Sequence, residues 1–281
     1  MIDLHAHTTA SDGTLTPTQL VHLARERGLS ALAVTDHDTV DGVAEAMEAA
    51  AQCGVELVPG IELSVDYPHG ELHLLGYLLD YQDPAFIQQL TNIQENRFNR
   101  NGVLLRRIQE HGFDITRQEV EAEAGGGQIG RPHFARALIR KGYASSVPDA
   151  FERFLGTGRP LHVPKVRLDP EAAIRLIHQA GGLAVIAHPK FLAFPSAEAL
   201  ELELERLQAL GLDGLECYYR MHTQFETERF LGIARRLGLL VTAGSDFHGL
   251  FGDEPVLGLV YQGRAGDDSL LADLKRAGRR S

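Results

Sequence analysis

The chain has 281 residues, 44% of them hydrophobic and 23% charged, which is an ordinary composition for a globular protein with a sizeable core. Its formal net charge of −11 argues against binding long duplex nucleic acid by bulk electrostatics, although a cation in a site could still attract a small anion. Two distant cysteines give no disulfide framework. The polar start indicates no signal peptide, and the apolar runs are too short to span a membrane. We therefore expect a cytoplasmic protein that does not bind a membrane.

Short apolar runs alternate with helical patterns along most of the chain. The predicted strands are residues 2–7, 31–38, 56–65, 71–79, 183–189, 212–219 and 239–248. The predicted helices between them are residues 17–28, 43–54, 170–182, 197–211 and 223–238. Thr16 is expected to cap the first helix, with Pro17 in its first turn and Gly28 at its end. This alternation predicts a parallel sheet covered by helices, and about seven strands predict a closed or nearly closed β/α barrel.

Residues 83–166 break this rhythm. Their pattern is mostly helical, with predicted helices at residues 84–112, 131–142 and 147–158, and they are rich in arginine. We therefore divide the chain into an α/β barrel of residues 1–82 and 167–281 and a helical insertion of residues 83–166. We expect this insertion to act as a substrate cap.

Most of the predicted strands end in side chains that bind metals. In a β/α barrel the C-terminal ends of the strands open onto one face, so these side chains should meet in one pocket. On a strand, residues two apart point the same way, so His5 and His7 should share a face, as should Asp246 and His248. The whole predicted set consists of His5, His7, Asp12, His37, Glu62, His73, His188, Asp246 and His248.

The donor set indicates which metals would bind. Mixed imidazole and carboxylate ligands suit Zn²⁺, Mn²⁺ or Fe²⁺ better than Ca²⁺. Six histidines and three carboxylates are too many for one ion and about right for two or three. Glu62 is the best candidate for a bridging carboxylate. Two nearby metals can hold a phosphate and generate hydroxide at neutral pH, so the pattern favours phosphate ester hydrolysis.

Six motifs resemble those of the PHP (polymerase and histidinol phosphatase) family, in order and in residue type. They are DLHAHTTASDG, VTDHDT, GIELS, LHLLGY, IAHP and GSDFHG. The resemblance implies a distorted (β/α)₇ TIM-like barrel, called the PHP fold, with a centre of two or three metals that hydrolyses phosphoesters. It also implies catalytic roles for His5, His7, Glu62, Asp246 and His248.

The resemblance further implies how the ligands are grouped, with Glu62 bridging two metals. The implied groups are His5, His7, Glu62 and Asp246 for one metal, Glu62, His73 and His188 for a second, and Asp12, His37 and His248 for a third. Many family members with three metals have histidine where this chain has Asp12. An aspartate makes the third site more suitable for Mn²⁺ or Mg²⁺.

The motif IGRPHFARAL and the helical insertion resemble the stand-alone bacterial members that act on nucleoside 3′,5′-bisphosphates and, in some cases, on the 5′ ends of short RNA. This implies a phosphatase that uses a metal-activated hydroxide to convert adenosine 3′,5′-bisphosphate to AMP. Mn²⁺ is the first choice of ion, with Zn²⁺, Fe²⁺ and Mg²⁺ as alternatives. A 5′–3′ exoribonuclease, a histidinol-phosphate phosphatase, a metal-dependent amidohydrolase and a non-enzymatic metal- or nucleotide-binding regulator stay open.

The insertion supplies the candidates for substrate binding. Arg131, His133 and Lys165 flank glycine and proline turns that could aim them at the phosphate that is not cleaved. Remote binding energy of this kind can orient the reacting group. Phe134 or Tyr143 could stack on a base.

Four further acidic residues near strand ends are expected to play other roles. Asp3, Asp36 and Asp38 are expected to orient ligands or cap turns, since a metal-bound histidine usually donates its other N–H to such a partner. Glu216 also ends a predicted strand, and the sequence leaves its role open.

Overall fold

The computed structural model describes residues 1–124, 129–163, 167–249 and 256–278, except for the side chain of Arg97. The chain forms two compact units. The barrel unit comprises Met1–Gln89 and Arg167–Ser281, and the insertion unit comprises Leu90–Val166. The division falls inside helix α3 (Pro84–Glu110), whose first residues belong to the barrel unit.

One seven-stranded sheet forms the centre of the barrel unit, with the strands in chain order. The strands are β1 (Ile2–Asp3), β2 (Ala31–Val34), β3 (Glu56–Val65), β4 (Leu72–Tyr77), β5 (Leu183–Ile186), β6 (Gly214–Tyr219) and β7 (Leu240–Gly244). β1, β2 and β3 are parallel, and so are β5, β6 and β7. β4 runs antiparallel to both β3 and β5, so the expectation of a wholly parallel sheet is wrong for this strand. The cause is the short connection of residues 66–71, since a parallel pair needs a longer crossover.

The two ends of the sheet come together. The backbone N–H of Leu4, just after β1, donates to the carbonyl of Ala243 in β7 at 3.0 Å. Ala6 and Phe247 form a parallel bridge a little further along. The sheet is therefore a nearly closed barrel, which confirms the expected distorted (β/α)₇ architecture.

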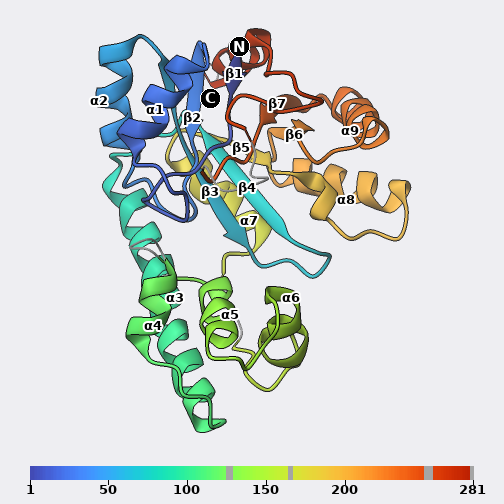
Figure 1. Ribbon diagram of the computed structural model, residues 1–281. Helices are drawn as coiled ribbons and strands as arrows, with labels where there is room; N and C mark the ends of the chain where they lie inside the picture. Colours follow the sequence, from blue (N-terminus) through green and yellow to red (C-terminus); the bar gives the residue numbers. More distant parts are fainter. Residues whose placement is uncertain (125–128, 164–166, 250–255, 279–281) are drawn as a thin grey trace. The chain divides into compact units, whose positions relative to one another are not determined.

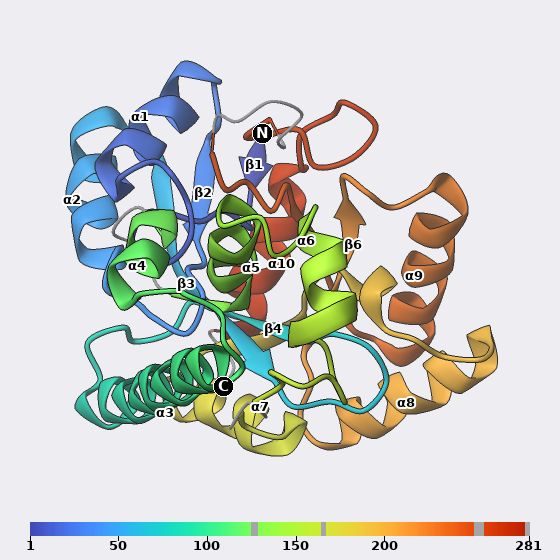
Figure 2. The same ribbon diagram turned by 60° about the horizontal axis from the view of Figure 1, so that its bottom comes forward.

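Helices cover the outside of the barrel (Figures 1 and 2). They are α1 (Pro17–Glu26), α2 (Val43–Cys53), α7 (Pro170–Gln179), α8 (Ala197–Ala209) and α9 (Gln224–Leu237), and a short 3₁₀ helix spans Pro189–Phe191. The last helix, α10 (Asp268–Gly278), lies instead at the centre of the ring of strands in Figure 2. Figure 1 shows α1 and α2 side by side, next to β2. The predicted cap of α1 is confirmed, since the Thr16 side chain accepts the N–H of Gln19 and Pro17 is the first helical residue.

Helix α10 was not among the predicted elements. Its Leu271 and Leu274 are buried against residues of the first strands, such as Ile2 and Leu4, and against Val185 in β5. A separate apolar cluster joins α1 and α2 to β2. Apolar packing thus supports the strand ends that carry the polar residues.

The insertion unit is helical, as expected. Besides most of α3 it contains α4 (Arg117–Ala124), α5 (Arg131–Arg140), α6 (Val147–Ala150) and a π-helical turn at Phe151–Leu155. Helix α4 was not predicted. The unit has its own apolar core, in which Leu104, Ile108, Phe134 and Leu138 are almost fully buried.

No helix in the described segments combines the length and the hydrophobicity needed to cross a membrane.

Candidate metal centre

The structure brings all nine predicted ligands together at one end of the barrel, where the carboxyl ends of the parallel strands meet the amino end of the antiparallel β4. His5, His7 and Asp12 follow β1, His37 follows β2, Glu62 and His73 lie in β3 and β4, His188 follows β5, and Asp246 and His248 follow β7. Two of these positions, and the neighbour of a third, need unusual backbone conformations. His188 and Asp246 have positive φ angles of 26° and 56°, and Asp38 beside His37 has 54°. Such conformations cluster at functional sites because the surrounding structure has to hold them.

Glu62 lies at the middle of the cluster and is fully buried. Its two oxygens face five histidine rings. Oε1 lies 2.9 Å from His73 Nδ1 and 3.0 Å from His188 Nε2. Oε2 lies 3.1 Å from His37 Nδ1, 3.3 Å from His7 Nε2 and 3.4 Å from His5 Nε2. A carboxylate with different histidines at each oxygen is suited to bridging two cations.

Asp246 and Asp12 complete the cluster on the side of His7. Asp246 Oδ1 lies 3.2 Å from His7 Nε2 and 3.4 Å from His5 Nε2. Asp12 Oδ1 lies 3.3 Å from His248 Nε2 and 3.7 Å from His7 Nδ1. The two nitrogens of His7 therefore face different carboxylates.

The ligand atoms form three overlapping groups, each with its donors within 4.8 Å of one another. The groups are His5, His7, Glu62 and Asp246; His37, Glu62 and His73; and His7, Asp12, His37 and His248. The first group matches the set implied for one metal. In the second, His37 takes the place expected for His188, although His188 also contacts Glu62. In the third, His7 joins the three expected residues.

The cluster's electrostatics are those of closely paired opposite charges. Burial would lower the pKa of His7, but the close carboxylates of Asp246 and Glu62 raise that pKa to about 10. Burial would raise the pKa of Glu62, but the charges of His37, His5 and His73 hold it well below its usual range. Burial lowers the pKa of His37 to about 3, despite the nearby carboxylates.

Several buried imidazole nitrogens and one carboxylate oxygen form no good hydrogen bond within the described part of the chain. They are His5 Nε2, both ring nitrogens of His7, His37 Nδ1, His188 Nδ1 and Glu62 Oε2. A buried polar atom without a hydrogen bond destabilises the folded state, so the gathering of several such atoms in one cluster needs an explanation. Divalent cations fit this donor set, because mixed imidazole and carboxylate ligands are those that Zn²⁺, Mn²⁺ and Fe²⁺ bind.

Glu216 holds two of the candidate ligands in place. Its buried carboxylate accepts the Nδ1–H of His5 at 3.0 Å and the backbone N–H of His188 at 2.7 Å. A carboxylate can only accept here, so the proton of a neutral His5 lies on Nδ1 and Nε2 is left to bind a cation. Gly244 permits this contact, since a Cβ there would lie 2.5 Å from Glu216 Oε1.

Tyr219 was missed by the sequence analysis. Its hydroxyl donates to Asp246 Oδ2 at 3.2 Å, and its ring packs against that of His188. A β-bulge between Glu216 and Tyr218 shifts the register of β6. Glu216 and Tyr219 are consequently both buried, whereas strict alternation would pair Glu216 with Tyr218.

Asp36 and Asp3 support the loops that carry the ligands, as expected. Asp36 accepts the backbone N–H and the hydroxyl of Thr8, both at 2.7 Å, and the hydroxyl of Ser11 at 2.6 Å. Asp3 accepts the backbone N–H and the hydroxyl of Ser245 at 2.9 and 2.6 Å. The carboxylates thus fix the segments on either side of the cluster.

The predicted substrate-binding residues lie in the insertion unit. The Arg131 guanidinium lies over the ring of Phe151, 5.4 Å from its centre. His133 Nδ1 accepts the backbone N–H of Gly130 at the start of α5. Phe134 is 2% exposed and belongs to the unit's apolar core. Lys165 lies outside the described residues. Substrate binding by all four stays a prediction.

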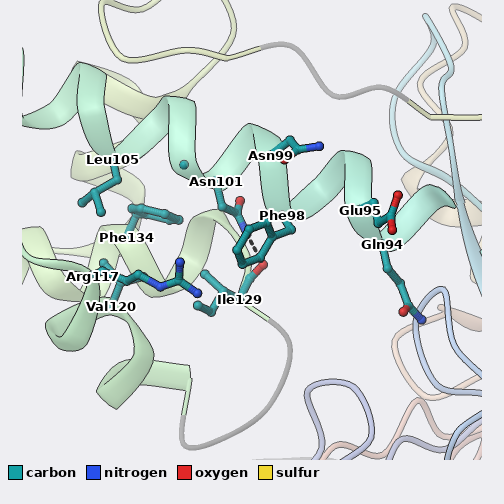
Figure 3. A pocket seen from close by; sticks show the side chains of 11 residues that line it. Gln94, Glu95, Phe98, Asn99, Asn101, Leu105, Arg117, Val120, Ile129 and Phe134 are labelled. Atoms are coloured by element: carbon teal, nitrogen blue, oxygen red, sulfur yellow. Dashed lines mark hydrogen bonds between the residues drawn. The ribbon is translucent and has the colours of Figure 1, made fainter. Parts of the chain in front are cut away.

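A cavity of about 630 Å³ lies within the insertion unit (Figure 3). Its apolar wall includes Leu105, Val120 and Phe134. At its edge the Arg117 guanidinium lies 4.9 Å from the ring centre of Phe98, whose side chain is 59% exposed. Phe134 therefore faces a cavity as well as the core.

Comparisons with known proteins agree with this geometry. The family model of the PHP domain matches residues 3–153, just over half of the chain. A 5′–3′ exoribonuclease, Rnm, of Escherichia coli K12 is 36% identical over 248 residues, which cover 88% of this chain and 84% of the relative. A 3′,5′-nucleoside bisphosphate phosphatase of Chromobacterium violaceum is 35% identical over 255 residues, which cover 88% and 87%.

A solved structure is similar over almost the whole chain. It comes from Bifidobacterium adolescentis and is described as a metal-dependent phosphoesterase. It superimposes with a TM-score of 0.81 at 33% identity, covering 97% of this chain and 94% of the other. The chain belongs to the PHP domain family. It is an enzyme of the metal-dependent phosphoesterase class, and hence a hydrolase.

Proposed function

We propose that this enzyme removes the 3′-phosphate of nucleoside 3′,5′-bisphosphates and converts adenosine 3′,5′-bisphosphate to AMP. Water adds to phosphorus, the bond to the ribose O3′ breaks, and the ribose oxygen leaves as a hydroxyl group. The observation that carries the proposal is the buried cluster in which Glu62 faces five histidines. The activity named for the Chromobacterium violaceum relative supports the choice of substrate.

The three overlapping groups of donors would hold two or three divalent ions, with Mn²⁺ as our first choice. When bound, such ions supply Lewis acidity, which polarises phosphoryl oxygens and lowers the pKa of water. The chain's own residues fix the donors beforehand. Glu216 sets the proton of His5 on Nδ1, and Tyr219 holds the second oxygen of Asp246. A cluster held in this way needs little reorganisation during the reaction.

We assign recognition of the second phosphate to arginines of the insertion unit. The pKa of His162 is lowered by partial burial and by the charges of Arg131, Arg107 and Arg100. Arg107 also donates to the backbone carbonyl of His162. Three guanidinium groups around one residue make a region of positive potential in a chain of net charge −11. Phosphate is the ligand for which arginine is best suited.

Phosphate release in the presence of Mn²⁺ tests the proposal. The substrates are adenosine 3′,5′-bisphosphate, AMP and histidinol phosphate, with the His7→Ala variant as the inactive control. We expect turnover of the bisphosphate in preference to the two monophosphates, with AMP as the product. Equal turnover of all three, or a preference for histidinol phosphate, would contradict the proposal.

The Arg131→Ala variant tests the role of the insertion separately. We expect kcat/KM for the bisphosphate to fall by roughly tenfold or more, because a charge-assisted hydrogen bond contributes about 1.5–3 kcal/mol. Turnover of AMP should change little. An unchanged kcat/KM for the bisphosphate would show that Arg131 does not bind the second phosphate.

A second candidate function is 5′–3′ exoribonuclease activity on short RNA that carries a 5′-phosphate. The relative of that name in Escherichia coli, 36% identical to this chain, favours it. The same assay with a 5′-phosphorylated oligonucleotide distinguishes the two. Stepwise release of mononucleotides at a rate above that of the bisphosphate would make the exoribonuclease the better description.

A further inference from the structure

We propose that Phe191 and Met221 of the barrel unit form the surface on which the nucleobase of the substrate lies, next to the metal centre. The inference rests on the proposed function and adds how the enzyme selects nucleotides among phosphate esters. Phe191 would be a specificity-determining residue that contacts the base by its ring.

Both side chains adjoin residues of the metal centre. The ring of Phe191 lies 5.2 Å from that of the ligand His188, measured between ring centres, and 6.4 Å from that of Tyr219. The Tyr219 hydroxyl lies 3.4 Å from the sulfur of Met221 and 3.2 Å from Asp246 Oδ2. A phosphate held at the cluster would therefore bring the rest of the nucleotide close to Phe191 and Met221.

Phe191 and Met221 are also available for contact. Phe191 is 37% exposed and Met221 45%, although most large apolar side chains of the barrel are buried. A single exposed apolar residue needs no explanation, but two beside a reaction centre indicate a surface that a ligand covers. An aromatic ring and a polarisable thioether suit the flat face of a base.

The backbone at both residues is held firmly. The carbonyl of Phe191 accepts the N–H of Glu71 at 3.1 Å. Gly70 comes so close that a Cβ there would lie 2.2 Å from this carbonyl oxygen. Lys190 donates to the carbonyl of Met221 at 2.5 Å, and so ties the two segments together. A surface fixed in advance binds with a smaller entropic cost.

Stacking of this kind tolerates different bases, because every base has a flat face. The subsite should therefore distinguish nucleotides from phosphate esters without a base, and should distinguish bases from one another only weakly. The expected loss on removing the ring is about tenfold in kcat/KM, within the range known for base–aromatic stacking.

The first test compares Phe191→Ala with the wild type on two substrates. These are adenosine 3′,5′-bisphosphate and its abasic analogue, 1,2-dideoxyribose 3,5-bisphosphate. We expect the variant to lose about tenfold in kcat/KM on the nucleotide, mainly through KM, and to change less than about twofold on the analogue. Phe225→Ala is the matched control, since Phe225 on α9 is 73% exposed. Equal losses on both substrates, or no loss on the nucleotide, would overturn the base subsite.

The second test measures binding directly. The chain has no tryptophan, so Phe191→Trp introduces a single fluorescent reporter. We expect AMP to quench its fluorescence by stacking, while the Phe225→Trp variant does not respond. If AMP inhibits turnover of the Phe191→Trp enzyme and its emission stays unchanged, the base lies elsewhere and the inference is wrong.

The two proposals fail in different ways. If the wild type releases no phosphate from the bisphosphate, the proposed function falls, and the base subsite falls with it. If the wild type turns over the bisphosphate and Phe191→Ala does so equally well, only the base subsite falls.

Discussion

The interiors of the two units of this protein differ in kind. The barrel unit buries imidazole and carboxylate groups in one cluster, where Glu62, His5 and His7 are fully buried. The core of the insertion unit is apolar, with Phe134 and Leu138 at its centre. Ion pairs of the insertion, such as that between Arg117 and Glu121, lie at its surface. The barrel unit thus buries a cluster of ionisable groups, whereas the core of the insertion unit consists of apolar side chains.

This difference has a physical consequence for stability. Buried charges are costly unless they are paired, and even a paired cluster stabilises less than apolar packing. Divalent ions bound at the cluster would offset that cost in the barrel unit. The core of the insertion unit is stabilised by apolar contacts alone. Metal binding should therefore not change the stability of this unit directly.

The largest expected effect comes from the bridging carboxylate. We expect Glu62→Gln to lower kcat for phosphate release by roughly 10³-fold, since metal ions contribute several kcal/mol of transition-state stabilisation. Phosphate release at saturating Mn²⁺ measures this. Glu201→Gln removes a half-buried carboxylate, paired with Arg236 on the helical outside of the barrel unit, and should retain full activity. A loss of less than tenfold in Glu62→Gln would show that the cluster is not the reaction centre.

A core substitution in the insertion should act on stability instead. Leu138 is fully buried, so Leu138→Ala should lower the free energy of unfolding by about 2–5 kcal/mol. Urea unfolding with and without Mn²⁺ measures this loss. Leu202→Ala, at a position 68% exposed, is the control. A loss that Mn²⁺ fully restores would contradict the separation of the two interiors.

The next effect concerns the residue that orients His5. We expect Glu216→Gln to lower Mn²⁺ affinity by about 10–100-fold, as for other hydrogen-bond partners of metal-bound histidine. Calorimetric titration of metal-free protein measures the affinity, and urea unfolding of the same preparation checks that the fold is retained. An unchanged Mn²⁺ affinity would show that Glu216 does not orient the metal-binding histidines.

The sequence predicted that these nine side chains lie together because two geometric rules constrain residues at strand ends. Residues such as His5 and His7 share a face of a strand, and the barrel brings distant strand ends to one pocket. The bulge in β6 could not be predicted, because it depends on how two strands pair and not on the residues of one strand. Tyr219 was missed for this reason, and Glu216 was left open.

The fold was predicted to a similar extent. All seven strands were found, and β3 has the predicted bounds of residues 56–65. The antiparallel direction of β4 follows from the length of its connection to β3, which the alternation of strands and helices concealed. Helix α10 was missed even though its apolar positions, such as Leu271 and Leu274, pack against the barrel. Packing of this kind depends on distant partners.

A smaller effect should appear in the pH dependence of metal binding. The close carboxylates of Asp246 and Glu62 outweigh the effect of burial and raise the pKa of His7 to about 10, so this ring is protonated at neutral pH before metal binds. Metal binding requires the proton to leave, so Mn²⁺ affinity should rise with pH, by about tenfold per pH unit for each proton displaced. Calorimetry between pH 6 and 8 in buffers of different ionisation enthalpy counts these protons. An affinity independent of pH would contradict the ion pairing of His7.

The most direct test of the central claim is the number of Mn²⁺ ions that each chain binds at equilibrium dialysis. The account predicts two or three ions in the wild type, and the loss of at least two in Glu62→Ala, because both oxygens of Glu62 face separate sets of histidines. Leu202→Ala should bind as the wild type does. One ion or none in the wild type, or the same number in Glu62→Ala, would contradict the assignment of this cluster as a centre of two or more metals.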